Sequence, residues 1–298
     1  MHFQYYFLLC TFAFTDLTKF VHLSPIVKRQ APSFHPTQVG TVKSDKITEA
    51  SGLAASRKHP GFLYTHNDHG GHAEIYVISA SSGHREATIE LSGVTSNDWE
   101  DIAIGRCHAG PSDFCIYIGD FGDGGKGALN NIYRIAEPDA FQNHMHILVS
   151  SIDKLEFSWN QKDCETLMID PNANLYIISK VHNAHGTIAA LPNHAWGTGS
   201  RVDVSSTAIL NIESPTFDPV GGDISFDGNE VLIKAHHAVF YWNMGGSNDY
   251  LATLQTPGTK VTYIDEPQGE SVCWDASGLG YYTLSEGNNE HLYHYIRT

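Results

Sequence analysis

The sequence predicts an all-β protein, a five-bladed β-propeller with four antiparallel strands in each blade, and three observations support this fold class. A short motif in which a polar residue precedes alternating apolar residues recurs five times along the 298 residues. The column residues of successive copies lie 48 to 65 positions apart, which is roughly the period of four-stranded propeller blades. Further strand-like segments follow each copy, separated by turns rich in Gly, Pro, Asn and Asp.

The repeated motif defines the innermost strand of each expected blade. Its copies begin at Glu49, Asp98, Asp163, Gly221 and Gln268. Aligned on their alternating apolar residues, the copies share one column that contains Ser51, Glu100, Glu165, Gly222 and Glu270, with Asp223 one place beyond. Three carboxylates and a hydroxyl at equivalent positions indicate a ring of oxygen atoms around a common axis.

The other strands follow in the same order in each repeat. Second strands are expected at residues 62–66, 115–119, 175–179, 231–234 and 281–285, and third strands at 74–78, 131–135, 187–191, 238–242 and 291–295. Fourth strands are expected at 85–91, 147–157, 201–210 and 250–255. The last repeat lacks a fourth strand, and we expect residues 37–42 to supply it and close the ring.

The N-terminus has the features of a targeting segment. Residues 5–14 form an apolar run that suits the core of a signal peptide and is too short to span a bilayer. Lys28 and Arg29 form a dibasic pair that marks a candidate propeptide boundary. We therefore expect residues 1–29 to be a signal peptide and propeptide, residues 30–298 to form the propeller, and the product to be secreted into the extracellular space.

Charge limits the classes of partner. The formal net charge is −15, and no basic cluster is present to displace the counterions of a nucleic-acid polymer. No segment is long and apolar enough to anchor the chain in a membrane. We therefore expect a monomer whose partner is a small-molecule ligand or substrate.

The cysteines fit an oxidising compartment. Cys107 and Cys115 flank a turn-rich segment, and a disulfide across that hairpin is expected. Cys164 and Cys273 lie in strand-like apolar runs, so we expect them to be buried thiols.

The predicted fold brings the unusual polar residues to one face. In a blade, the start of the first strand and the end of the antiparallel second strand meet at the same edge. The column should therefore lie beside a second group of polar residues: Asn67, Asp68, His69, Asp120, Lys180, Lys234, His236 and Glu286. Carboxylates crowded on one axis raise one another's pKa values or recruit a cation.

The donor set favours calcium. Carboxylate and hydroxyl oxygens suit Ca²⁺ better than zinc or copper. The expected ligands are Ser51, Glu100, Glu165, Asp223 and Glu270. The alternative is structural, because acidic side chains at strand starts can also accept hydrogen bonds from neighbouring backbone N–H groups.

The surrounding residues are candidates for chemistry. Asp68, Asp120 or Glu286 can act as a general base, and Lys234 can stabilise developing negative charge. Candidate substrate contacts come from Asn67, His69, Lys180 and His236. For the two lysines, an ion pair with a neighbouring acid is an equal alternative.

These residues resemble a known family. The order of Ser, Glu, Glu, small residue and Glu at the inner strand starts is similar to the calcium-activated nucleotidases, or apyrases, and the segments 49–54, 63–70 and 99–104 are similar to their motifs. The resemblance implies a five-bladed propeller with one axial Ca²⁺, and Ser51, Glu100, Glu165 and Glu270 as ligands. Gly222 stands where that family has Ser, so Asp223 would substitute for it. His69 stands where the family has a phosphate-contacting Arg.

A second resemblance is to a group of uncharacterised secreted propeller proteins found widely in bacteria. The segments 98–103 and 266–270 carry it. This group has no activity to transfer.

Two functions follow from the sequence. The first is a calcium-dependent hydrolase of a small phosphorylated or lactone-like substrate. The second is a non-catalytic extracellular binding or scaffold module whose axial metal holds the blades together. A sugar-binding lectin ranks last, because no pocket of aromatic and Asp or Asn residues repeats in every blade.

Overall fold

The computed structural model describes residues 31–69, 72–107, 113–122, 130–142, 144–181, 185–192, 196–204, 206–212 and 218–298. The chain divides into two units, residues 1–30 and Ala31–Thr298. The expected signal peptide and propeptide at 1–29 lie outside the described residues. Among the described residues, no helix has both the length and the apolar character needed to cross a bilayer.

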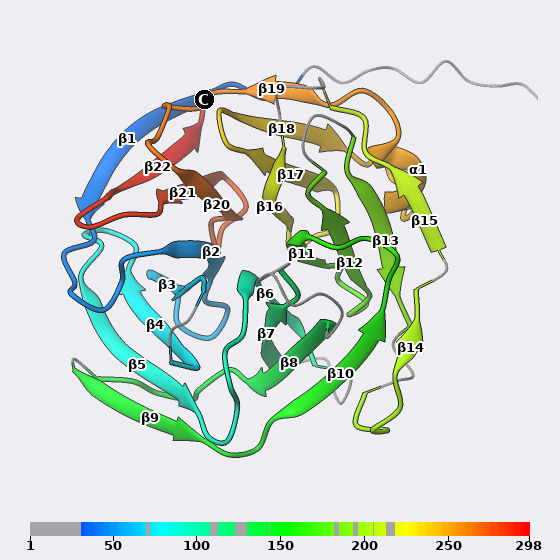
Figure 1. The fold of residues 1–298 in the computed structure, drawn as a ribbon. Coiled ribbons are helices and arrows are strands. Elements are labelled where there is room, and N and C mark those ends of the chain that lie inside the picture. The colour runs from blue at the N-terminus through cyan, green and yellow to red at the C-terminus, as the bar shows by residue number, and fades with distance from the viewer. Residues whose placement is uncertain are drawn as a thin grey trace, which may run out of the picture. The chain divides into compact units, whose positions relative to one another are not determined.

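Residues Ala31–Thr298 form five small sheets arranged in a ring, which confirms the predicted five-bladed β-propeller (Figure 1). Blade 1 contains, from the centre outward, β2 (Ala50–Ala55), β3 (Phe62–Asn67), β4 (Glu74–Ser79), β5 (Arg85–Leu91) and β9 (Met145–Val149). Blade 2 contains β6 (Trp99–Arg106), β7 (Phe114–Asp120), β8 (Asn130–Ala136), β10 (Asp153–Ser158) and β14 (Val202–Asp203).

The remaining blades have four strands each. Blade 3 contains β11 (Cys164–Ile169), β12 (Leu175–Ser179), β13 (Thr187–Leu191) and β15 (Ser206–Ile209). Blade 4 contains β16 (Pro219–Ile224), β17 (Glu230–Ala235), β18 (Ala238–Asn243) and β19 (Thr259–Val261), with α1 (Tyr250–Leu254) between the last two. Blade 5 contains β20 (Gly269–Trp274), β21 (Gly280–Ser285), β22 (His291–Arg297) and β1 (Phe34–Thr41).

The innermost strands are buried on both faces. Every residue of β2, β11, β16 and β20 is buried, because each inner strand packs between neighbouring blades. The core consequently lies between sheets. One cluster joins Leu232 and Tyr241 of blade 4 to Val272, Trp274 and Tyr281 of blade 5.

The ring closes through the N-terminal strand, as predicted. β1 pairs antiparallel with β22, from Phe34 opposite Arg297 to Thr41 opposite His291. Phe34 also packs its ring 4.8 Å from that of Tyr281. Strands from the two ends of the sequence therefore complete one blade, so the sheet joins segments that are far apart in the chain.

The predicted cysteine chemistry is confirmed. Cys107 and Cys115 form a disulfide, with their Cα atoms 5.2 Å apart. Cys164 and Cys273 are free and buried.

Three of the four expected fourth strands were wrong in detail. A strand was expected at 250–255, but Tyr250–Leu254 form the short helix α1. Asp249 caps its N-terminus by accepting from Ala252 N, and the side chains of Tyr250 and Leu254 are buried. The outer strand of blade 4 is β19. The single strands expected at 147–157 and 201–210 each divide in two, and β9 and β14 join the preceding blade by parallel pairing.

Candidate functional site: a carboxylate-lined hub

Each inner strand begins with a break in its pairing register. The breaks fall between Ala50 and Leu53, Trp99 and Asp101, Cys164 and Thr166, Pro219 and Gly221, and Gly269 and Ser271. The residues left out of the ladder are Ser51 with Gly52, Glu100, Glu165, Val220 and Glu270. β-bulges of this kind redirect a side chain locally, and here they recur in all five blades.

The bulges correct the alignment of the fourth repeat. The sequence alignment placed Gly222 in the column, but the residue at the bulge of β16 is Val220. Two adjacent glycines, Gly221 and Gly222, gave no side-chain pattern from which to set the register. The hub therefore carries three glutamates, one serine and one valine.

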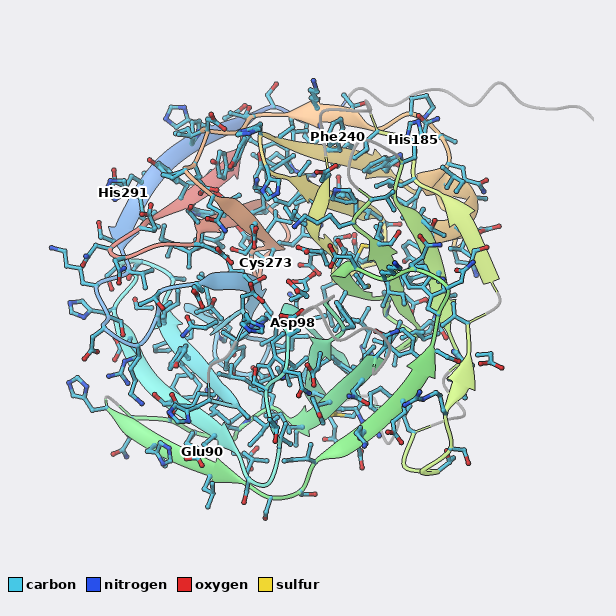
Figure 2. All side chains as sticks on the ribbon, viewed as in Figure 1. Glu90, Asp98, His185, Phe240, Cys273 and His291 are labelled. Carbon is cyan, nitrogen blue, oxygen red and sulfur yellow. A yellow bond between two sulfur atoms is a disulfide. The ribbon has the colours of Figure 1, made fainter. Side chains whose placement is uncertain are left out.

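Glu100 and Glu165 lie at the centre of the carboxylate cluster. One oxygen each from Glu100, Glu165 and Asp163 lie within 4.8 Å of one another. A second set of oxygens with the same limit comes from Glu100, Asp98 and Asp68. Asp98 lies close to the propeller axis (Figure 2). The two sets share Glu100, so carboxylates from blades 1, 2 and 3 converge.

Burial and mutual repulsion raise the pKa values in this cluster. Glu100 and Glu165 are each 5% exposed. Burial raises the pKa of Glu100 well above its usual range, and the carboxylates of Glu165 and Asp68 add to the effect. Burial also raises the pKa of Glu165, although the ammonium of Lys180 opposes it. Without a bound cation these carboxyls therefore tend to keep their protons, because ionising them together where water is largely excluded is unfavourable.

The other two predicted ligands of the ring have different surroundings. The Ser51 hydroxyl donates to the backbone carbonyl of Glu100 at 2.6 Å, so its proton already links blades 1 and 2. Glu270 is buried, and its Oε1 lies 4.0 Å from His236 Nδ1. Its charge raises the pKa values of Asp68 and Glu165, which places Glu270 within electrostatic reach of both sets.

Asp223 belongs to a deeper layer of the hub. Its Oδ2 accepts from the backbone N–H of Trp274 at 2.8 Å, across the junction of blades 4 and 5. Asp101 makes the matching contact between blades 2 and 3, where its Oδ2 accepts from Leu167 N at 2.8 Å. The sequence named Asp223 as a metal ligand, and the structure shows that its Oδ2 is engaged by this backbone contact.

Asp68 and Glu286 lie beside the column residues, in the part of the hub that we call the rim, and each has an oxygen without a hydrogen-bond partner among the described residues. These oxygens, Asp68 Oδ1 and Glu286 Oε1, are buried. Burial and the neighbouring Asp98 raise the pKa of Asp68 to about 7. Burial and Glu270 raise the pKa of Glu286 to about 9, and its other oxygen accepts from the amide of Gln268.

Lys180 provides positive charge at the cluster. Its ammonium lies 2.9 Å from Glu165 Oε1. Burial lowers the pKa of Lys180, but the charge of Glu165 outweighs this and the net pKa is raised. The ion pair that the sequence offered as one alternative is therefore present, and it neutralises a single member of the cluster.

Lys234 is a buried structural residue. It is fully buried, and its ammonium donates to the carbonyls of Ala235, His236 and Gly269 at 2.5, 3.0 and 2.8 Å. Burial lowers its pKa to about 7, despite the charge of Glu266. All three N–H groups are used, so in this arrangement Lys234 has no donor left for a substrate.

Three other predicted residues hold loops in place. Asp120 accepts from the backbone N–H of Asp98 at 2.9 Å and from the amide of Asn97 at 2.9 Å, which fixes the turn before Glu100. The Asn67 side chain accepts from Thr48 N at 3.1 Å. His69 is exposed and its Nδ1 lies 3.1 Å from Asp98 Oδ1.

Asp98 and Asp163 are members of the site that were not predicted from the sequence. Both precede a column glutamate by two residues, in the segments Asp98-Trp-Glu and Asp163-Cys-Glu. This repeated Asp-x-Glu spacing was visible in the sequence. Gly122 was also missed: a Cβ there would collide with Glu100 and Asp98, so glycine is needed for the loop to pass the carboxylates.

The cluster fits a calcium ion by its donor chemistry. Ca²⁺ binds six to eight oxygens at about 2.3 to 2.6 Å, so two ligands of one ion lie within about 5 Å of each other. Both sets of carboxylate oxygens meet this limit of mutual distance. Glu100, Asp163 and Glu165 are the residues that would hold the ion, with Asp68 and Asp98 beside them.

The fold and its hub define the class: a five-bladed β-propeller whose inner strands present carboxylates to the axis. No family model matches the sequence, and no curated protein does either. Solved structures with a similar fold include a PQQ-bound aldose sugar dehydrogenase from Streptomyces coelicolor, 12% identical, with a TM-score of 0.50. That match covers 89% of this chain and 99% of the dehydrogenase.

A gluconolactonase from Xanthomonas campestris is also similar, at 12% identity and a TM-score of 0.48. The match covers 92% of this chain and 98% of the lactonase. At 12% identity the similarity to the dehydrogenase shows the fold alone, so any function has to be inferred from the residues of the hub.

Proposed function

We propose that the protein is a secreted hydrolase of a small phosphorylated or lactone-like molecule, with Ca²⁺ bound at the hub. One observation carries the proposal: buried and half-buried carboxylates from three blades place their oxygens within 4.8 Å of a common partner, Glu100. Lys180 offsets one of these charges. A divalent cation would offset the others and lower their pKa values.

A bound cation of this kind would polarise a substrate oxygen or activate a water molecule. The chain's own residues supply proton transfer and charge. Asp68, whose pKa is raised to about 7, can take up and release a proton near neutral pH. Lys180 and His236 lie beside Glu165 and Glu270, where they can contact an anionic or carbonyl oxygen of a substrate.

The disulfide supports secretion. Cys107–Cys115 closes a hairpin of blade 2, and such bonds persist in oxidising compartments. The segment expected to direct export is residues 1–29.

A non-catalytic role is the second candidate, and a specific observation favours it. Lys234 and Asp120, two of the four residues assigned to catalysis, are occupied by hydrogen bonds within the protein. In this alternative the cation would hold the inner strands together, and the rim would bind a ligand without changing it.

Calorimetric titration of the purified protein with Ca²⁺, followed by a screen of nucleotides, phosphodiesters and lactones, separates the candidates. A hydrolase should lose turnover in EDTA and in Glu100→Gln, and keep it in Glu156→Gln, which removes a carboxylate from the outer part of blade 2. Calcium binding with no turnover of any substrate would favour the scaffold. Turnover that persists in EDTA would rule out a calcium-dependent reaction.

A further inference from the structure

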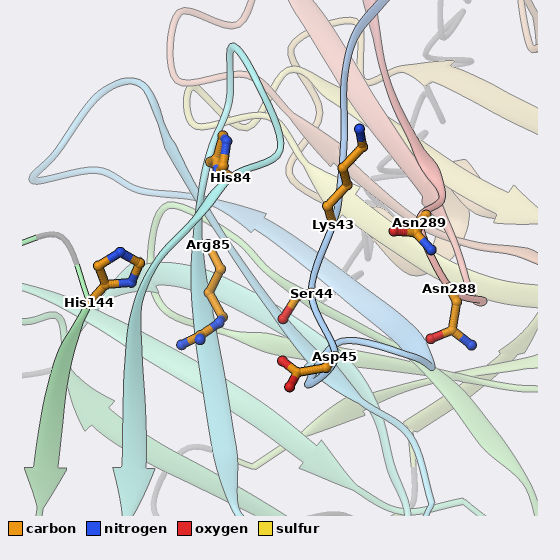
Figure 3. A pocket seen from close by; sticks show the side chains of 8 residues that line it. All are labelled: Lys43, Ser44, Asp45, His84, Arg85, His144, Asn288 and Asn289. Carbon is orange, nitrogen blue, oxygen red and sulfur yellow. The ribbon is translucent and has the colours of Figure 1, made fainter.

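A pocket on the outer wall of the propeller has the opposite character to the hub. It has a volume of about 540 Å³ and contains four basic side chains: Lys43, His84, Arg85 and His144 (Figure 3). Four basic groups in one place are unusual in a protein with a formal net charge of −15. We call it the seam pocket, because it lies where the ring closes between blades 5 and 1.

The seam pocket is built from four separate segments. Lys43 follows β1 of blade 5, and Asn288 and Asn289 come from the turn between β21 and β22. His84 lies at the end of the turn between β4 and β5 of blade 1, Arg85 is the first residue of β5, and His144 precedes β9 of that blade. Groups from both blades therefore face one cavity, with Arg85 between His144 and the segment after β1 (Figure 3).

Backbone hydrogen bonds hold these segments in position. Thr41 N donates to Ser82 O at 3.2 Å, and Val42 N donates to Glu290 O at 2.8 Å, so the end of β1 is tied to both turns. His144 N donates to Glu86 O at 2.6 Å. The frame of the pocket is consequently formed before any ligand arrives, which lowers the entropic cost of binding.

The side chains of the pocket are mostly hydrogen-bond donors. Arg85 donates from Nη1 to Thr88 at 3.0 Å, which anchors its guanidinium and leaves further N–H groups available. In the described part of the chain, no ion pair joins Lys43 or Arg85 to a carboxylate. Asp45 is the acidic member of the lining, so positive charge is in excess.

We propose that the seam pocket binds a small oxyanion, a phosphate or sulfate group, either free or carried on a sugar. The guanidinium of Arg85 and the ammonium of Lys43 provide charge-assisted donors for its oxygens. The amides of Asn288 and Asn289 add neutral donors from the other side. A bound anion would link blade 5 to blade 1 and so stabilise the closed ring.

The test uses inorganic phosphate, inorganic sulfate and glucose 6-phosphate at constant ionic strength, in EDTA so that the hub is inactive. Affinity is measured by calorimetry and the stabilisation by thermal unfolding. Lys43→Gln/Arg85→Gln should weaken binding at least tenfold and abolish the rise in Tm. Lys154→Gln, which removes an exposed lysine from blade 2, should leave both unchanged.

The outcomes are distinct. Tighter binding of glucose 6-phosphate than of phosphate identifies a sugar-borne group, and equal affinities identify the free anion. Because Arg85 also contacts Thr88, the single variant Lys43→Gln provides an independent check and should itself weaken binding. Wild-type protein that binds none of the three at millimolar concentration, or variants that bind like wild type, would overturn the proposal.

Discussion

Glu100 and Asp101 are adjacent on β6 and both are buried, yet their carboxylates have different surroundings. Burial raises the pKa of both carboxyls well above the usual range. Glu100 stands at a bulge, where the neighbouring carboxylates of Glu165 and Asp68 add to the effect. Asp101 accepts backbone N–H groups from Ile102 and Leu167, at 2.8 Å each. Asp223 repeats the Asp101 arrangement in blade 4 by accepting from Trp274 N.

The difference shows that the acidic residues of this hub have two roles, one structural and one in the carboxylate cluster. In the deeper layer, a carboxylate joins two blades by accepting a backbone N–H of the next one. At the rim, the bulge turns the side chain toward the axis, where its neighbours are other acids. Residues of the same chemistry thus stabilise the ring in one layer and form the proposed cation site in the other.

Adding calcium should cause the largest change in stability, and we expect the ion to bind only the rim carboxylates around Glu100. With free Ca²⁺ at a hundred times its Kd, we expect wild-type protein to gain about 2.7 kcal/mol of unfolding free energy over protein in EDTA. Glu100→Gln should lose most of this gain. In EDTA the same variant should unfold at a higher temperature than wild type, because the cost of burying an ionisable carboxyl whose folded-state pKa is raised is removed. Thermal unfolding checks both, and a calcium response that survives in Glu100→Gln would refute the rim as the cation site.

Asp101→Asn should lower the stability of the protein in EDTA, whereas Glu100→Gln should raise it. One oxygen of Asp101 accepts from Ile102 N and the other from Leu167 N, so the asparagine amide would face an N–H donor. We expect a loss of about 1 to 3 kcal/mol in unfolding free energy, in EDTA and in calcium alike. Denaturant unfolding under both conditions measures it. A variant as stable as wild type would show that the two layers do not differ as described.

The smallest effect concerns pH. Asp68 and Glu286 have folded-state pKa values raised to about 7 and about 9. A raised carboxyl pKa means that the folded protein binds more protons than the unfolded chain, so these two groups lower stability as pH rises from about 4 to 9. Calcium competes with those protons.

The increase in Tm on adding calcium should therefore be larger at pH 8 than at pH 5. The same increase in Tm is measured for Glu100→Gln at each pH, and the difference between the two proteins removes the pH dependence that other groups contribute. His66 is one such group, because burial lowers its pKa to about 4. An increase that is constant across this range would show that the rim acids do not bind protons in competition with the cation.

Much of the fold could be predicted from the sequence because strands and turns have local signatures. Apolar alternation fixed β13 and β5 at their observed bounds, and the need for a fourth strand in the last blade led to β1. The Cys107–Cys115 disulfide followed from spacing and turn residues. By contrast, the alternation of apolar residues wrongly predicted a strand at 250–255. A helix of five residues has too few turns for its period to be distinguished from that of a strand.

The site was harder to predict because it depends on contacts between blades. The sequence brought Glu100, Glu165 and Glu270 into one column, but it could not show that Val220, two residues before Gly222, takes the fourth place. It also could not show that the ammonium of Lys234 is surrounded by three carbonyls, since one of them belongs to Gly269 in the next blade.

By itself the sequence determined the number of blades, the order of their strands and the supply of acids to the inner edge, because these follow from periodicity and residue type along the chain. Only the tertiary structure determines which carboxylates lie close to one another and which accept hydrogen bonds from backbone N–H groups. That choice depends on bulges and on distances between strands that the sequence keeps far apart. The same closure of the ring created the seam pocket, whose parts come from both ends of the propeller unit.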